Sequence, residues 1–145
     1  MNLRIICFED NPNEIKNLKA SFTEKKHSVD FLAYDMKEDW DEKSKRAQEI
    51  ARFNPDLAIV DLADQQGTGE RNVGFRIIRK LKELQEINQN INTFPVIAWS
   101  KYLTDTPAGR NLKEKARTYS AIPIFKPRRK KYNVADMLRK AELSK

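Results

Sequence analysis

Five short apolar segments alternate along the chain with five amphipathic segments, and this alternation limits the fold more than any other feature. The apolar runs are short and nearly continuous, which is typical of buried β-strands. They span residues 3–8, 29–33, 57–62, 95–99 and 121–125. The amphipathic segments carry apolar residues at helical spacing and span residues 15–22, 40–53, 75–84, 112–119 and 134–141. Strands that alternate with helices predict an α/β fold: a five-stranded parallel sheet with helices on both faces.

The chain length and the absence of a linker in the sequence indicate one domain. The chain has 145 residues, and we find no repeat or low-complexity segment that divides it. We therefore expect a single domain over residues 1–145, with no separate output domain. No run approaches the roughly 20 apolar residues of a membrane span. Glu9 and Asp10 interrupt the N-terminal apolar run too early for a secretory signal.

The counts of cysteine and histidine exclude several classes of site. Cys7 is the only cysteine, so the chain has no internal disulfide framework and no cysteine-based zinc site. His27 is the only histidine, which argues against His-rich metal sites and against most Ser-His or Cys-His catalysis. A reducing, cytoplasmic location fits this composition.

The positive charge of the chain is concentrated near its C-terminus. The net charge is +7, but residues 110–145 alone hold 12 Lys and Arg against 3 Asp and Glu. Residues 1–109 are close to neutral, with 16 basic against 18 acidic residues. A basic surface suits an anionic partner, either an acidic protein or a nucleic acid. The run at 126–131 is more typical of a solvated loop, because charge runs alone are weak indicators of nucleic-acid binding.

Polar residues with complementary chemistry lie at or directly after the carboxyl ends of four of the predicted strands. In an open parallel sheet, ligands bind beyond the carboxyl ends of the strands, so these positions are candidates for a site. The residues there are Glu9, Asp10, Asp61, Ser100 and Lys126. Two carboxylates about 4 Å apart repel by about 4 kcal/mol at an effective dielectric constant near 20. Three of them therefore need a cation or protons, and Mg²⁺ is the hard cation that prefers oxygen ligands.

Such a site supports phosphoryl transfer without histidine or cysteine. Asp61 can act as a nucleophile and form an aspartyl phosphate. Lys126 supplies a positive charge for a phosphoryl oxygen, and Ser100 supplies a hydrogen bond.

These segments resemble, in order, the receiver domains of bacterial two-component response regulators. The matching pieces are IICFEDN, PDLAIVDL, GFRIIRKLK, FPVIAWS and IFKP. The resemblance covers nearly the whole chain and implies the (βα)5 flavodoxin-like receiver fold. It further implies that a histidine kinase or a phosphotransfer protein donates a phosphoryl group to this chain, which is then not a turnover enzyme.

The resemblance also assigns roles to the strand-end residues. Asp61 becomes the phosphoacceptor, Ser100 the switch hydroxyl, and Lys126 the contact to the phosphoryl group. The implied ligands of Mg²⁺ are Glu9, Asp10, Asp61 and the backbone carbonyl of Ala63. The peptide bond between Lys126 and Pro127 is expected to be cis, as is usual in that family.

Two positions depart from the family pattern and keep an alternative open. Lys101 follows the switch hydroxyl, where the family has a small residue, and Pro123 replaces the switch aromatic. The chain is therefore also a candidate pseudo-receiver, a binding module that works without phosphorylation. A phosphatase of related topology is disfavoured, because position 63, where such enzymes have a second acid, is Ala63.

The resemblance places the partner-binding face on the fourth helix, the fifth strand and the fifth helix. In this chain the face is rich in Lys and Arg, so we expect an acidic protein partner there. Nucleic acid is the less favoured alternative, and no membrane partner is expected.

Overall fold

The computed structural model confirms the predicted alternation of strands and helices. It describes residues 2–24, 28–36, 40–41, 43–62, 73–88, 91, 93–127 and 132–143. Within these residues the strands are β1 (Asn2–Phe8), β2 (Ser28–Tyr34), β3 (Leu57–Asp61), β4 (Val96–Ser100) and β5 (Ile122–Phe125). The helices are α1 (Pro12–Glu24), α2 (Lys45–Phe53), α3 (Val73–Ile87), α4 (Pro107–Thr118) and α5 (Val134–Lys140).

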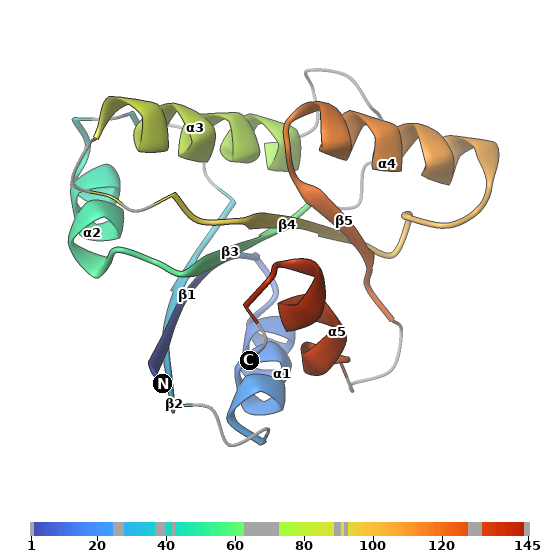
Figure 1. Cartoon of the computed structure of the whole chain (residues 1–145), viewed down its shortest axis with the longest axis horizontal. Helices are drawn as coiled ribbons and strands as arrows, with labels where there is room; N and C mark the ends of the chain where they lie inside the picture. The colour runs from blue at the N-terminus through green and yellow to red at the C-terminus, as the bar shows by residue number, and fades with distance from the viewer. Residues whose placement is uncertain are drawn as a thin grey trace.

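All strand pairs are parallel, and the strand order in the sheet is β2-β1-β3-β4-β5 (Figure 1). The chain moves outward from β1 to β2, returns to the other side of β1 with β3, and continues to β5. The order therefore reverses between β1 and β3, which is the point where ligands bind in doubly wound sheets. This topology confirms the predicted fold class, the flavodoxin-like (βα)5 sheet.

Helices cover both faces of the sheet, as the sequence predicts (Figure 1). On one face α1 and α5 bury Leu18, Phe22, Val134, Met137 and Leu138 against the strands. On the other face α2, α3 and α4 bury a second cluster that includes Ile50, Ile78 and Leu112. Alternate residues of β1 enter the two cores: Ile5 and Cys7 enter the first, and Ile6 and Phe8 enter the second.

The start of α2 differs from the sequence prediction. The apolar spacing predicts a helix over residues 40–53, whereas α2 begins at Lys45. Ser44 is the N-cap, and its hydroxyl accepts a hydrogen bond from the Ala47 amide at 3.2 Å. This side-chain bond satisfies an amide of the first turn and stops the helix from extending further back. Trp40 still packs in the core against Phe8, but from the segment before the helix.

Pro123 lies in β5, at the edge of the sheet. A proline has no amide hydrogen to donate, and an edge strand tolerates this because one of its sides has no neighbouring strand. The predicted strand over residues 121–125 therefore forms despite its proline. None of the helices in the described residues is long and apolar enough to cross a membrane.

Candidate functional site

The carboxyl ends of four strands bring most of the predicted site residues to one edge of the sheet. Asp61 is the last residue of β3 and Ser100 the last residue of β4. Glu9 directly follows β1, and Lys126 directly follows β5. The Lys126 amide donates to the Ser100 carbonyl at 3.0 Å, which continues the β4–β5 ladder to the site. The side chain of Lys126 thus enters the site from a fixed backbone position.

The Lys126 ammonium lies among carboxylates. In the described part of the chain, Nζ is 3.3 Å from Asp61 Oδ1, 3.2 Å from Glu9 Oε2 and 3.6 Å from Glu14 Oε2. The side chains of Glu9, Asp61 and Lys126 are 4%, 13% and 13% exposed, so little water screens these contacts. The structure therefore brings together Glu9, Asp61 and Lys126, as the sequence predicts.

The pKa values in this cluster are shifted because its charges are buried and unequal in number. Burial raises the pKa of Glu9 to about 7, the negative charge of Asp61 adds to this rise, and Lys126 opposes it. Burial alone lowers the pKa of Lys126, but the carboxylates of Asp61, Glu9 and Glu14 outweigh this effect and hold its pKa above the ordinary value. Lys126 thus stays charged, while Glu9 is the group that titrates near neutral pH.

Asp10 is at the expected edge, but its carboxylate contacts another segment. Asp10 Oδ1 accepts a hydrogen bond from the Met36 amide at 2.9 Å, in the stretch that follows β2. Glu9 Oε1 accepts a hydrogen bond from the Asn11 amide at 3.1 Å. The Asp10 carboxylate therefore connects the segment after β1 to the segment after β2.

Ser100 is buried, and its hydroxyl oxygen accepts a hydrogen bond from the Tyr102 amide at 3.0 Å. This bond holds the turn after β4 in place. The hydroxyl hydrogen of Ser100 is not used by this contact and is available to an incoming oxygen.

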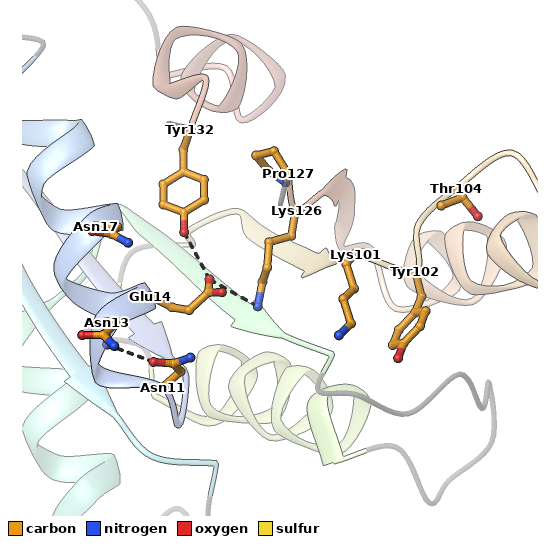
Figure 2. A pocket seen from close by; sticks show the side chains of 10 residues that line it. All are labelled: Asn11, Asn13, Glu14, Asn17, Lys101, Tyr102, Thr104, Lys126, Pro127 and Tyr132. Carbon is orange, nitrogen blue, oxygen red and sulfur yellow. Dashed lines mark hydrogen bonds and ion pairs between the residues drawn. The ribbon is translucent and has the colours of Figure 1, made fainter. Parts of the chain in front are cut away.

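Sequence reasoning missed two residues of the site, Glu14 and Tyr132. Glu14 lies in the first turn of α1, and its Oε2 accepts a hydrogen bond from the Tyr132 hydroxyl at 3.2 Å (Figure 2). The rings of Tyr132 and Trp99 pack edge to face, with a centroid distance of 5.0 Å and an interplanar angle of 78°. The sequence position of Glu14 could have indicated its role, because the first turn of α1 begins at the same edge of the sheet as the site.

Two neighbouring cavities open at this edge. One, of about 330 Å³, is lined by the acidic residues Glu9, Asp10, Glu14 and Asp61 together with Lys101 and Lys126. The other, of about 650 Å³, lies between α1 and the segments after β4 and β5, and Figure 2 shows its lining side chains. Lys101 contributes to both cavities, so it adds a second ammonium at the site.

The donor chemistry of the smaller cavity fits a hard divalent cation. Its carboxylate oxygens are the ligands that Mg²⁺ prefers, and the negative charge of Asp61 adds to the rise that burial causes in the pKa of Glu9. The described residues, however, contain no group of three or more His, Cys, Asp or Glu side chains arranged to hold a metal ion. Lys126 instead provides the positive charge between Glu9 and Asp61.

Two of the sequence predictions lie outside the described residues, and one is wrong. Ala63, an expected ligand through its carbonyl, and the basic stretch 128–131 lie outside the described residues. The expected cis bond between Lys126 and Pro127 is wrong: no peptide bond in the described stretches of the chain is cis. The trans form is the one that X–Pro bonds favour by about 0.5–1 kcal/mol in the absence of a specific constraint.

Comparison with solved structures identifies the fold. The chemotaxis protein CheY4 of Vibrio cholerae matches with a TM-score of 0.63 at 12% identity, over 97% of this chain and 99% of that chain. A CheY-like receiver domain from Methylobacillus flagellatus matches with a TM-score of 0.61 at 13% identity, over 97% of this chain and 99% of that one.

A eukaryotic receiver domain matches to a similar extent. The receiver domain of Saccharomyces cerevisiae Ssk1, solved with the histidine phosphotransfer protein Ypd1, has a TM-score of 0.60 at 14% identity, over 97% of this chain and 86% of that chain. No protein-family model and no curated protein matches the sequence. The resemblance to response regulator receiver domains is thus confirmed at the level of the fold.

Proposed function

We propose that this chain is a phosphoacceptor signalling protein that receives a phosphoryl group on Asp61. The observation that supports this most directly is the distance of 3.3 Å between Asp61 Oδ1 and Lys126 Nζ. Asp61 ends a central strand at the edge where ligands bind in such sheets, and its side chain is 13% exposed. A fixed ammonium at this distance can stabilise the charge of a phosphoryl group as it arrives.

The reaction needs one nucleophile and no second acid or base from the chain. A carboxylate oxygen of Asp61 attacks the phosphorus of a phosphohistidine on the donor. The new O–P bond forms as the P–N bond breaks, and the electron pair of that bond returns to the imidazole, which takes a proton from solvent. Lys126 contacts the transferred oxygens, and Ser100 donates its hydroxyl hydrogen to one of them. The protein is modified once per cycle, so we propose a switch and not a turnover enzyme.

Mg²⁺ is part of this proposal, with Glu9, Asp10, Asp61 and the carbonyl of Ala63 as its ligands. When bound, the ion neutralises the carboxylates and the incoming phosphoryl oxygens. The three carboxylates around the Lys126 ammonium support a requirement for added positive charge at this place.

The partners follow from the fold and from the surface charge. A receiver domain of the same fold has been solved with a histidine phosphotransfer protein, so we propose a phosphohistidine donor of that kind or a histidine kinase. For output we propose an acidic protein that binds the exposed basic side chains of α4, among them Arg110 and Arg117. We also propose a cytoplasmic location, which the free thiol of Cys7 supports.

The test is phosphorylation by a small donor. The protein is incubated with acetyl phosphate and Mg²⁺, and intact mass spectrometry measures the addition of one phosphoryl group. We expect the wild type to be modified and Asp61→Asn to stay unmodified. Asp105→Asn is the matched control, because Asp105 lies before α4 and its side chain is 99% exposed. A wild type that gains no phosphoryl group, or an Asp61→Asn variant that still gains one, would contradict the proposal.

A second candidate function is binding without phosphorylation. The observation in its favour is that the Lys126 ammonium already has carboxylate partners and that the Asp10 carboxylate already accepts the Met36 amide. A cluster of this kind can connect the strand ends without a phosphoryl group. On this reading Asp61→Asn keeps full function in cells, whereas the phosphoacceptor proposal requires that it lose the phosphorylation-dependent response.

A further inference from the structure

Two residues outside the strand ends connect the Lys126 ammonium to the start of α5. Glu14 Oε2 lies 3.6 Å from Lys126 Nζ and also accepts the hydrogen bond from the Tyr132 hydroxyl at 3.2 Å. Figure 2 shows the Glu14 carboxylate between the phenol and the ammonium. The same carboxylate group thus contacts a residue of the candidate site and a residue that is two positions before α5.

Trp99 contacts both Lys126 and Tyr132. Its indole is fully buried in β4. Lys126 Nζ lies 4.5 Å from the ring centroid, and the Tyr132 ring packs edge to face on the same side chain. Lys126 and Tyr132 therefore share two partners, Trp99 and Glu14, so a movement of the ammonium alters the surroundings of Tyr132.

Tyr132 is in turn joined to the helix that follows it. Tyr132 is 8% exposed, and its carbonyl accepts a hydrogen bond from the amide of Val134, the first residue of α5. Asn133 caps the helix by accepting the Asp136 amide at 3.0 Å. A displaced Tyr132 therefore changes the position of the first turn of α5.

We propose that Glu14 and Tyr132 hold Lys126 in a resting position and couple the phosphoryl state of Asp61 to the start of α5. This inference rests on the proposed function. Phosphorylation replaces the single negative charge of Asp61 by a group that carries close to two. The ammonium then moves toward the phosphoryl oxygens. Its contact to Glu14 is the longest of the three carboxylate contacts and breaks first. Glu14 and Tyr132 are positioning residues in this scheme, and no bond is made or broken at either.

The coupling is tested by NMR with beryllofluoride and Mg²⁺ as the mimic of the phosphoryl group. Backbone amide shifts are followed at Tyr102 and Leu103 after β4 and at Asn133 and Val134 at α5. We expect both regions to shift in the wild type. In Tyr132→Phe, which keeps the ring on Trp99 and removes only the hydroxyl, the shift at α5 is lost and the shift after β4 remains.

The matched control is Tyr119→Phe. Tyr119 is the C-cap residue of α4, and its ring packs on Phe75 in the other core. This variant should respond like the wild type. An α5 shift that persists unchanged in Tyr132→Phe would overturn the coupling and leave the proposed function intact. A wild type in which neither region shifts would contradict the proposed function and the coupling with it.

Glu14 is tested separately by the affinity for beryllofluoride. Glu14→Gln removes a competitor for the ammonium and a negative charge from the site. We expect the affinity in the presence of Mg²⁺ to rise by about threefold, the scale of a partly exposed ion pair. Glu24→Gln removes the same charge from the exposed end of the same helix, and we expect no change there. An affinity that stays constant or falls in Glu14→Gln would overturn the resting role of Glu14.

Discussion

Replacing Glu9 by Gln is expected to stabilise the protein at alkaline pH and not at acidic pH. Burial first, and then the charge of Asp61, raise the pKa of Glu9 from 4.5 to about 7. Between these two pH values the folded protein keeps a proton on Glu9 that the unfolded chain releases. The folded state therefore binds more protons, and the free energy of unfolding falls as the pH rises through this window.

The magnitude follows from the same two pKa values. At 1.36 kcal/mol per pH unit, the free energy of unfolding loses about 3 kcal/mol by pH 8 through Glu9 alone. The pKa of about 7 already includes the attraction of Lys126. Gln carries no charge and keeps an oxygen for the hydrogen bond from the Asn11 amide. Glu9→Gln should therefore be more stable than the wild type by about 2–3 kcal/mol at pH 8 and nearly equal to it at pH 4.5.

Urea unfolding followed by tryptophan fluorescence measures this difference. The two proteins are compared from pH 4.5 to pH 8 with a chelator present, so that no divalent cation compensates the carboxylates. Glu24→Gln is the control, because Glu24 lies exposed at the end of α1. If the wild type and Glu9→Gln lose stability in parallel over this range, Glu9 ionises like a solvated glutamate and the reasoning is refuted.

Substitutions at three further positions test close packing, backbone conformation and charge, each by urea unfolding. Gly74→Ala should lower the free energy of unfolding by about 1–3 kcal/mol or more, because its Cβ would lie 2.5 Å from the Asp61 carbonyl oxygen; an unchanged urea midpoint would contradict this contact. Asn54 ends α2 at a φ of 48°, so Asn54→Ala should cost about 1 kcal/mol while Asn54→Gly should not, and equal losses would exclude backbone strain. Lys126→Met should cost about 3 kcal/mol at pH 8 and clearly less at pH 5, where Glu9 holds a proton; a loss independent of pH would indicate packing alone.

The strands of this fold are predictable from the sequence because each carries a short apolar run, and the central strands β1, β3 and β4 are largely buried. The apolar runs place every strand end within one residue of the structure. A largely buried strand accommodates few polar residues, so a polar residue after an apolar run marks its carboxyl end, as Asp61 and Ser100 do in β3 and β4. Pro123 does not interrupt β5, because β5 lies at the sheet edge.

The start of α2 is harder to predict, because apolar spacing alone does not distinguish a helical residue from a nearby one that packs into the same core. Trp40 fits the helical pattern and is buried, yet it precedes the helix. Ser44 is the residue that indicates the start of the helix, because its hydroxyl at the N-cap accepts a hydrogen bond from the Ala47 amide.

The site is predictable only as far as topology determines it. Residues at or directly after the carboxyl ends of parallel strands must meet at one edge, and Glu9, Asp61 and Lys126 do. The direction of a side chain depends on local hydrogen bonds instead. The Asp10 carboxylate accepts a hydrogen bond from the Met36 amide, in the segment after β2. Tyr132 comes after β5 in the sequence, where no periodic pattern predicts that its hydroxyl contacts Glu14.

The excess of negative charge at this site indicates that a phosphoryl group needs a cation beside it. Glu9, Glu14 and Asp61 surround the ammonium of Lys126 in the described part of the chain, so the fully ionised cluster is negative before any ligand arrives. Burial, and then the charge of Asp61, raise the pKa of Glu9 to about 7, so a proton on Glu9 offsets part of this excess at lower pH. A phosphoryl group brings further negative charge, and a proton on Glu9 cannot offset it at neutral pH and above. A divalent cation can, because it contacts the carboxylates and the phosphoryl oxygens at once. The proposed function therefore requires that beryllofluoride bind to Asp61 only together with Mg²⁺; binding that is equally tight in a chelator would show that Lys126 and Lys101 alone supply the charge.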